Sequence, residues 1–335
     1  MLDLVHRASA NQLEGFGVLA AELDLHLLLA DSLALESSKE AFEKGFRLKH
    51  YGEILVAKLR EEFSAIIDKI QVRIITDGEK LAAPLEEARA VYRQRDERIR
   101  GMLDEDAETF YSCVLCQSYA PDHVCVVTPE RLGLCGAYTW LDCAASYEMN
   151  PHGPNQPIKK GDTVDQVKGQ WKGVNEYLEA ASNGNLERFN AYSMMEDPMT
   201  SCGCFECITA ILPEANGVMI VNREHEGMTP IGMTFSTMAG QIGGGIQTPG
   251  FIGMGKLYIS SKKFISAEGG LERVVWMPAA LKEEIRDRLT ERVEEIGKVD
   301  LLDKIATEED ATSSEELLAF LEKVGHPVLE MEPMF

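Results

Sequence analysis

Residues 110–136 read FYSCVLCQSYAPDHVCVVTPERLGLCG and contain four of the eight cysteines of the chain. The spacing is C-x2-C-x8-C-x9-C, with the thiols at Cys113, Cys116, Cys125 and Cys135. Thiols gathered this densely in a chain without secretory context usually hold metal rather than form disulfides. The fold of this part of the chain is therefore expected to bring all four together. Spacing alone leaves structural zinc and an iron–sulfur cluster equally open, because four-cysteine sets serve both.

The tripeptide Cys202-Gly203-Cys204 lies further along the chain and is a different kind of chelator. Its two thiolates flank the backbone nitrogens of Gly203 and Cys204. If both amides lose their protons, two sulfurs and two nitrogens can surround a metal in one plane. Square-planar coordination by nitrogen and sulfur indicates Ni(II) or Cu(II) rather than zinc or magnesium. Glycine at the centre lets the backbone bend tightly. The alternative is a redox pair or a buried turn.

Together the two motifs resemble the active-site segments of acetyl-CoA synthase, the nickel subunit of bifunctional carbon monoxide dehydrogenase/acetyl-CoA synthase. Residues 110–136 resemble the first segment of that family, and Ser201-Cys-Gly-Cys-Phe-Glu-Cys207 resembles the second. All six cysteines that the family uses are present in the right order. The resemblance covers nearly the whole chain, from about Leu4 onward, and corresponds to the C-terminal portion of the family.

The resemblance implies a metal centre of two nickel ions and one [4Fe-4S] cluster. Four cysteines would hold the cluster: Cys113, Cys116, Cys125 and Cys135. Cys116 would also bridge to a proximal nickel. Cys202 and Cys204 would chelate a distal nickel together with the amides of Gly203 and Cys204, and their sulfurs would bridge back to the proximal nickel. The proximal nickel would then keep the open position that a catalytic metal requires.

The activity that the resemblance implies is an acyl transfer, the synthesis of acetyl-CoA or its reverse cleavage. Carbon monoxide would combine with a methyl group from a methylated corrinoid iron–sulfur protein, and coenzyme A would remove the acetyl group. Such enzymes serve anaerobic carbon fixation in the Wood–Ljungdahl pathway. The carbon monoxide dehydrogenase subunit is the other implied partner. Full-length bacterial members extend further on the N-terminal side, so docking on the dehydrogenase is in doubt for this chain.

Several side chains near the motifs carry weaker signals. Tyr119 stands where the family typically has a phenylalanine close to the substrate-binding nickel, so it keeps the ring and adds a hydroxyl. His123 could donate a hydrogen bond to a cluster sulfur, or it could be a packed loop histidine. Cys143 and Cys207 match none of the ligands of the family and are expected to be small buried side chains.

The composition is that of a globular protein with room for two domains. The chain has 335 residues, of which 45% are hydrophobic and 26% are charged. The net charge of -22 argues against nucleic acid or an anionic membrane as a partner. The sequence shows no signal peptide and no apolar run of the roughly 18 residues that a membrane span needs. The cytoplasm, where thiols stay reduced, is the expected location.

The hydrophobic pattern predicts an α/β (α+β) fold in two domains. Residues 1–105 are expected to form a middle α/β domain that is incomplete at its N-terminus, and residues 106–335 a mixed α+β metal-cluster domain. Helices are predicted at residues 13–35, 52–63, 85–103, 164–181, 279–296 and 315–324. Strands are predicted at residues 70–75, 218–222 and 272–276.

Three further expectations concern the surroundings of the centre. The charged face of the helix at 85–103, which includes Arg95, is expected to be solvated. The glycine-rich residues 238–255 fit neither a P-loop nor a dinucleotide fingerprint and are expected to pack closely against another segment, which could be the metal centre. Residues 113–135 are expected to be ordered mainly by metal, because few apolar side chains there could pack alone.

Two other functions remain open from the sequence. One is a non-catalytic iron–sulfur electron-transfer module, or a zinc-stabilised interaction module. The other is a nickel storage or delivery protein. Metal content separates them, because the synthase requires about two nickel and four iron per chain. An electron carrier would hold iron without nickel, and a delivery protein nickel without iron.

Overall fold

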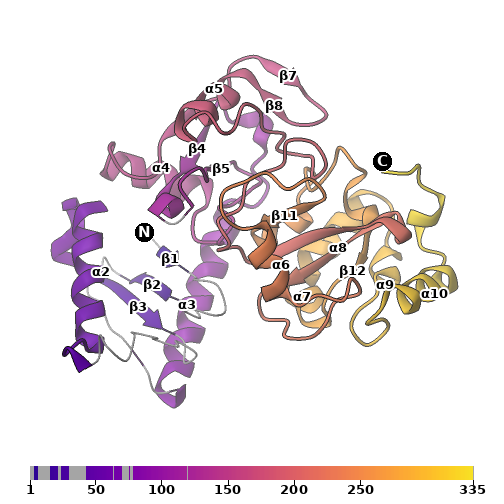
Figure 1. Cartoon of the computed structure of the whole chain (residues 1–335), viewed down its shortest axis with the longest axis horizontal. Coiled ribbons are helices and arrows are strands. Elements are labelled where there is room, and N and C mark those ends of the chain that lie inside the picture. Colours follow the sequence, from indigo (N-terminus) through magenta and orange to yellow (C-terminus); the bar gives the residue numbers. More distant parts are fainter. Residues whose placement is uncertain are drawn as a thin grey trace.

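A computed structural model describes residues 4–6, 16–21, 24–29, 43–62, 64–69, 75, 78–118 and 120–334. At the N-terminal end, β1 (Leu4–His6), β2 (Phe16–Ala21) and β3 (Asp24–Leu29) form an antiparallel sheet in the order β1-β2-β3. The sheet lies between α2 (Leu48–Glu62) and α3 (Gly78–Arg98), as Figure 1 shows.

Two helices predicted for this part are confirmed, and one is wrong. α2 and α3 cover most of the helices expected at residues 52–63 and 85–103. The helix expected at residues 13–35 is instead the hairpin of β2 and β3, in which Ala21 pairs with Asp24. Short apolar runs fit either a helix or a strand, and here pairing with β1 decides for strands. The strand expected at residues 70–75 lies outside the described residues apart from Ile75, which belongs to no regular element.

The middle of the chain forms two small sheets and two helices. β4 (Thr109–Cys113) pairs antiparallel with both β5 (Cys125–Val127) and β6 (Pro157–Lys159). β7 (Thr163–Asp165) and β8 (Gln170–Trp171) form a hairpin, and the helices are α4 (Trp140–Met149) and α5 (Lys172–Ala181).

The helix predicted at residues 164–181 is therefore wrong in its first half. Its second half is α5, whereas the first half forms β7, a turn and β8. Gly169 ends this turn at φ +68°, and an added Cβ there would lie 2.5 Å from the ring of Tyr192. A left-handed backbone under an aromatic ring requires glycine and cannot continue a helix.

The C-terminal part is built around a four-stranded sheet of order β11-β9-β10-β12. Its strands are β9 (Cys207–Leu212), β10 (Gly217–Asn222), β11 (Phe251–Met254) and β12 (Val274–Trp276), of which only β10 and β12 pair in parallel among the described strands. Its helices are α6 (Phe235–Ile242), α7 (Ala279–Glu284), α8 (Arg286–Glu295), α9 (Leu301–Lys304) and α10 (Ser314–Val324).

The predictions for this part hold with small changes. β10 and α10 lie where a strand and a helix were expected, and β12 covers the second half of the strand expected at residues 272–276. The helix expected at residues 279–296 is divided into α7 and α8 at Ile285. The two-domain division at residue 105 stays a prediction.

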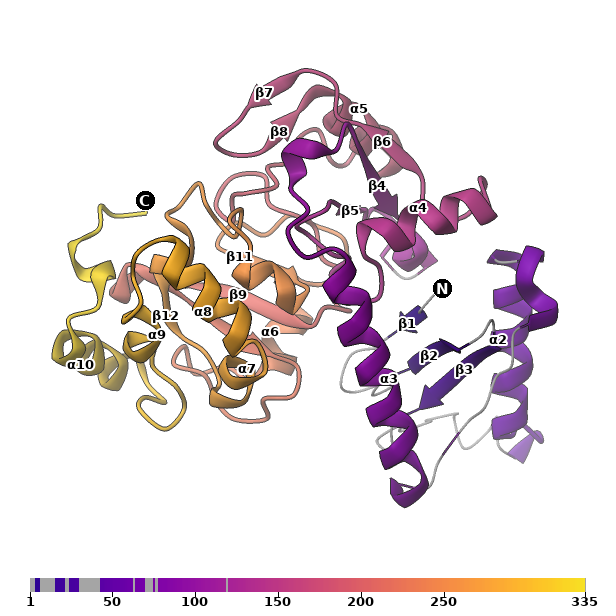
Figure 2. The same ribbon diagram turned by 180° about the vertical axis from the view of Figure 1, so that it is seen from behind.

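The central sheet separates two cores. Alternate residues of β9, Ile208 and Ala210, face a core that includes α6 and α10, whereas Cys207 faces a core that includes α7, α8 and α9. Both faces are covered, so the two central strands are almost entirely buried and mostly apolar rather than alternating. The architecture is α+β. Figure 2 shows α3 running from the N-terminal sheet toward β4 and β5. Within the described residues, no helix is long and apolar enough to cross a membrane.

Candidate metal centre

The β4–β5 hairpin positions the first set of thiols. Cys113 ends β4 and Cys125 begins β5, and the two are paired opposite each other. Cys116 lies between them on a short 3-10 helix, Leu115–Ser118. Cys135 follows β5 in a turn that is closed by a hydrogen bond from the Gly136 amide to the Gly133 carbonyl at 2.9 Å. The hairpin and its two flanking turns thus bring together the four cysteines of residues 110–136.

The second segment reaches the same place from the loop before β9. The pKa of Cys202 is raised first by a hydrogen bond with Cys116 and then by one with Cys204. The Cys204 amide also donates to Cys202 Sγ at 3.3 Å. Gly203 has a φ of +102°, and, apart from its two chain neighbours, no atom of the described residues lies within 4 Å of the position that a Cβ would take. The tripeptide is therefore bent in the left-handed region, and Cys116 lies beside both sets of thiols.

Burial controls the protonation of these thiols. It raises the pKa of Cys113 and Cys125 far above the ordinary range and that of Cys135 to about 12, and neighbouring cysteines raise each of them further. Backbone amides oppose this effect with hydrogen bonds to the sulfurs, and they belong to Leu115, Leu134 and Ala137 respectively. Without a metal these groups are neutral thiols, so metal binding must release protons here.

His123 lies between the two segments. Its side chain is fully buried, with Nε2 3.1 Å from Cys125 Sγ and Nδ1 2.8 Å from the hydroxyl of Thr200. Burial lowers the pKa of His123 to about 4, so the ring is neutral at neutral pH and carries one N–H. Of the two roles left open by the sequence, the hydrogen bond to a cysteine sulfur is the one found. Because Thr200 precedes the Cys-Gly-Cys segment, the histidine also ties that segment to β5.

The glycine-rich stretch packs against both segments, as expected. The Gly245 amide donates to the Ser201 carbonyl at 2.7 Å. A Cβ on Gly245 would lie 3.0 Å from the His123 nitrogen, and one on Gly243 would lie 3.6 Å from Gly203 Cα. At Gly245 the backbone at His123 lies too close for a side chain without a shift, whereas at Gly244 the φ of +94° favours glycine.

The remaining cysteines and Tyr119 have other positions. Cys143 is buried and accepts a hydrogen bond from Asn155 at 3.3 Å. Cys207 is buried on β9, in the core that includes α7, α8 and α9. Both agree with the expectation of small buried side chains. Tyr119 lies outside the described residues.

Sequence reasoning missed two charged residues beside the turn of Cys135. Arg95 was assigned to a solvated helix face, but its side chain is 3% exposed and bonds to that turn. Glu206 packs on Gly136, where a Cβ would lie 2.4 Å from the carboxyl carbon, and it accepts a hydrogen bond from the Lys256 amide at 2.9 Å. In the sequence, Glu206 stands between Cys204 and Cys207, and this was the only signal that pointed to it.

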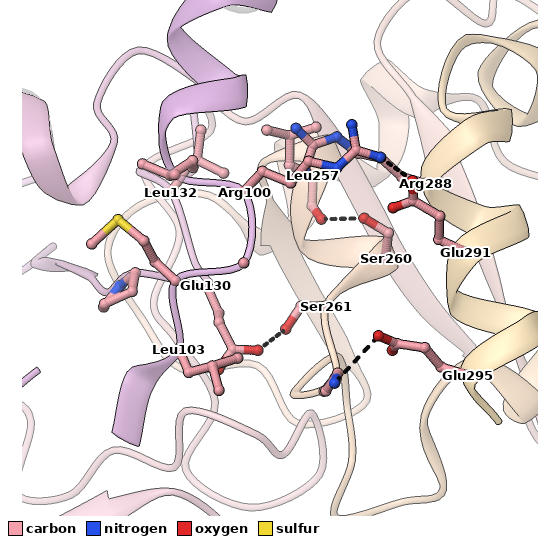
Figure 3. A pocket seen from close by; sticks show the side chains of 15 residues that line it. Arg100, Leu103, Glu130, Leu132, Leu257, Ser260, Ser261, Arg288, Glu291 and Glu295 are labelled. Atoms are coloured by element: carbon pink, nitrogen blue, oxygen red, sulfur yellow. Dashed lines mark hydrogen bonds and ion pairs between the residues drawn. The ribbon is translucent and has the colours of Figure 1, made fainter. Parts of the chain in front are cut away.

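A polar cavity of about 330 Å³ lies between the end of α3, the segment around Glu130, and α8 (Figure 3). Arg100 forms an ion pair with Glu291 across it, and Lys262 pairs with Glu295 at 3.3 Å. Burial raises the pKa of Glu130 to about 7. None of the described residues lining the cavity is a cysteine. This cavity is therefore distinct from the thiol centre.

The donor set suits an iron–sulfur cluster with nickel. None of the eight cysteines, all of which are described, forms a disulfide, and the six of the two motifs lie in a largely buried region with backbone amides and the His123 ring beside the sulfurs. No three His, Cys, Asp or Glu side chains of the described part converge tightly enough to enclose one ion. A four-iron cluster does not require such convergence, because each thiolate binds a different iron. The four thiols of residues 110–136 therefore fit such a cluster.

Comparison with known proteins gives two family matches. The family described as the C-terminal part of the ACS/CODH beta subunit matches residues 92–335, and the family described as the beta subunit of the CO dehydrogenase/acetyl-CoA synthase complex matches residues 20–81. A solved structure of the C-terminal domain of the acetyl-coenzyme A synthase alpha subunit is 57% identical and covers 40% of this chain and 100% of that one, at a TM-score of 0.38.

Two relatives are similar along most of the chain. The carbon monoxide dehydrogenase/acetyl-CoA synthase subunit alpha of Moorella thermoacetica is 60% identical over 301 residues, which are 90% of this chain and 41% of that one. The acetyl-CoA decarbonylase/synthase complex subunit beta of Methanopyrus kandleri is 49% identical over 320 residues, which are 96% of this chain and 65% of that one. The chain spans less than two thirds of the length of either relative.

Proposed function

Because the chain belongs to the ACS/CODH beta subunit family, we propose that it holds a nickel–nickel–[4Fe-4S] centre and acts as an acetyl-CoA synthase. The reaction joins carbon monoxide, a methyl group and coenzyme A, or cleaves acetyl-CoA in the reverse direction. It is an acyl transfer, which makes the chain an acyltransferase. Family membership does not favour the alternatives of an electron-transfer module or a nickel carrier.

The hydrogen bond between Cys116 and Cys202 is the observation that carries this proposal. It joins a thiol of the first motif to a thiol of the second, although the two are far apart in sequence. A bridging ligand would have to lie beside both metals, and the place of Cys116 next to Cys202 supports this role for it. Cys113, Cys125 and Cys135 complete the ligands of the iron–sulfur cluster, whereas Cys204 and the backbone at Gly203 complete the distal nickel site.

The bound nickel supplies an electron-rich, thiolate-ligated site with an open coordination position. The protein supplies the surroundings. The buried thiols give up their protons to bind metal, and neutral His123 presents its Nε2 to Cys125 Sγ. The hydroxyl of Thr200, hydrogen-bonded to Nδ1, fixes the orientation of the ring. Four of the six cysteines are buried and the other two, Cys135 and Cys202, are half-buried, which limits the access of water to the centre and protects a reduced metal site from side reactions.

The partners follow from the reaction. A methylated corrinoid iron–sulfur protein donates the methyl group, and the carbon monoxide dehydrogenase subunit supplies carbon monoxide. The relative from Methanopyrus kandleri carries the name of a complex subunit, which supports assembly with other chains. The cytoplasm is the compartment that keeps these thiols reduced.

The test measures acetyl-CoA formation by chain reconstituted anaerobically with iron, sulfide and nickel. The substrates are carbon monoxide, methylated corrinoid protein and coenzyme A. Wild-type chain and Cys207→Ser are expected to form acetyl-CoA, because Cys207 is buried in another core. Cys202→Ser is expected to fall to the background of the metal-free protein. Equal activity of Cys202→Ser and wild type would contradict the proposal.

A further inference from the structure

Arg95 is a buried cation at the end of α3. Its side chain is 3% exposed, whereas Arg93, two residues earlier, is 64% exposed and pairs with Glu86 at 2.7 Å. Arg95 Nη2 donates to the Gly136 carbonyl at 2.9 Å, and Nη1 donates to the Ala137 carbonyl at 2.8 Å. The guanidinium thus binds the carbonyls of the two residues that follow Cys135.

The Gly136–Ala137 peptide connects Arg95 to the centre. Its carbonyl accepts from Arg95 at 2.9 Å, and its amide, that of Ala137, lowers the pKa of the Cys135 thiol and so opposes the larger rise caused by burial. A peptide that accepts a charged donor at its oxygen becomes a stronger donor at its nitrogen, since hydrogen bonds in a chain polarise one another. Gly136 has a φ of +73°, and Glu206 fills the space that a side chain would need. The peptide is therefore held from both sides.

Two carboxylates accompany the cation. Asp96 accepts from Arg95 Nη2 at 2.7 Å, and Asp142 lies 3.9 Å from Arg95 Nε. Asp142 also accepts from the amide of Thr139, which caps α4. A buried arginine with these partners keeps one orientation, because its planar fork fits several acceptors at once. The group therefore ties α3, the turn after Cys135 and the start of α4 together.

We propose that Arg95 is a positioning residue of the metal centre, which orients and polarises the Gly136–Ala137 peptide so that its amide donates to the sulfur of Cys135. The inference rests on Cys135 binding the iron–sulfur cluster of the proposed function. Hydrogen bonds to cluster sulfurs stabilise the more negative, reduced cluster and so raise its reduction potential. Arg95 therefore sets the potential of the cluster from α3 without touching it.

The experiment compares cluster potentials in reconstituted variants. Arg95→Met removes the donors, and Arg95→Met/Asp96→Asn removes them without leaving Asp96 as a buried, unpaired charge. Arg95→Lys keeps the charge but loses the two-pronged contact. Arg93→Met is the matched control on the same helix. The readouts are iron per chain and the midpoint potential from an anaerobic spectroscopic redox titration.

Both Arg95→Met proteins are expected to keep their iron and to show a more negative midpoint. A tenfold change in the reduction equilibrium corresponds to about 59 mV for one electron. Arg95→Lys is expected to fall between them and wild type, and Arg93→Met to match wild type. If a folded Arg95→Lys or double variant kept the wild-type midpoint, the inference would be overturned while the proposed function stood. A wild-type chain that bound no cluster at all would instead overturn the proposed function.

Discussion

Gly203 shows how one residue can shape a metal site through its backbone. Its φ of +102° lies in the left-handed region, yet the space around it is open. From the sequence, this glycine was expected to let the backbone bend tightly. The positive φ agrees with that expectation, because residues with a Cβ rarely adopt this region.

The prediction concerns Gly203→Ala and Gly203→Pro. Alanine is strained by about 1–2 kcal/mol in the left-handed region and is expected to weaken nickel binding. Proline fixes φ near -65° and lacks the amide proton, so it is expected to abolish the planar nickel site. Iron should stay near normal in both, since the cluster cysteines are untouched. Nickel per chain and the absorption bands of square-planar Ni(II) are the measurements.

Gly184→Ala is the control, because Gly184 has a φ of +82° and equally open surroundings at the end of α5. It carries the same backbone strain away from the centre and should leave nickel unchanged. Full nickel content and normal acetyl-CoA formation in Gly203→Pro would show that the backbone of Gly203 is not a ligand.

The β4–β5 hairpin combines a metal motif with close packing. The motif was predicted from the sequence, whereas the packing was underestimated. Val124, Val126 and Leu134 are at most 1% exposed and belong to the large core that they share with β9, α5 and α6. The premise that few apolar side chains there could pack is wrong, whereas the ordering of residues 113–135 by metal stays a prediction. The apolar residues between the clustered cysteines were not recognised as part of a core.

A buried histidine in the segment that follows α10 should make the stability of the protein depend on pH. His326 Nε2 lies 3.1 Å from the Val274 carbonyl on β12, and Nδ1 accepts from the Val328 amide at 3.1 Å, so the ring must be neutral. Burial lowers the pKa of His326 to about 4. The unfolded chain binds this proton near pH 6.5, so stability from the neutral ring is present above that pH and is lost as pH falls toward 4. The loss reaches up to about 3 kcal/mol.

The measurement is the unfolding free energy of wild type and His326→Gln between pH 7 and pH 4. The variant lacks this titration, so it is expected to lose less stability than wild type over that range. Taking the difference between the two proteins cancels groups such as Glu130, whose raised pKa acts in the opposite direction. Parallel pH profiles would contradict the assignment of a neutral, buried His326.

For the molecule as a whole, the sequence predicted the α+β class and the cysteine motifs, because both depend on local pattern and on residue chemistry. It did not predict the meeting of the two motifs through Cys116 and Cys202, or the burial of Arg95. Those features depend on contacts between distant segments, which periodicity does not record. The wrong helix at residues 13–35 has a similar cause, because strand pairing is decided by neighbours.

The two-motif centre is tested most directly by metal content in anaerobically reconstituted chain. Wild type is expected to hold about two nickel and four iron. Cys202→Ser should lose the distal nickel and keep most of its iron, whereas Cys125→Ser should lose iron first, because each motif holds a different metal. Loss of the same metals in the same proportion from both variants would contradict the account.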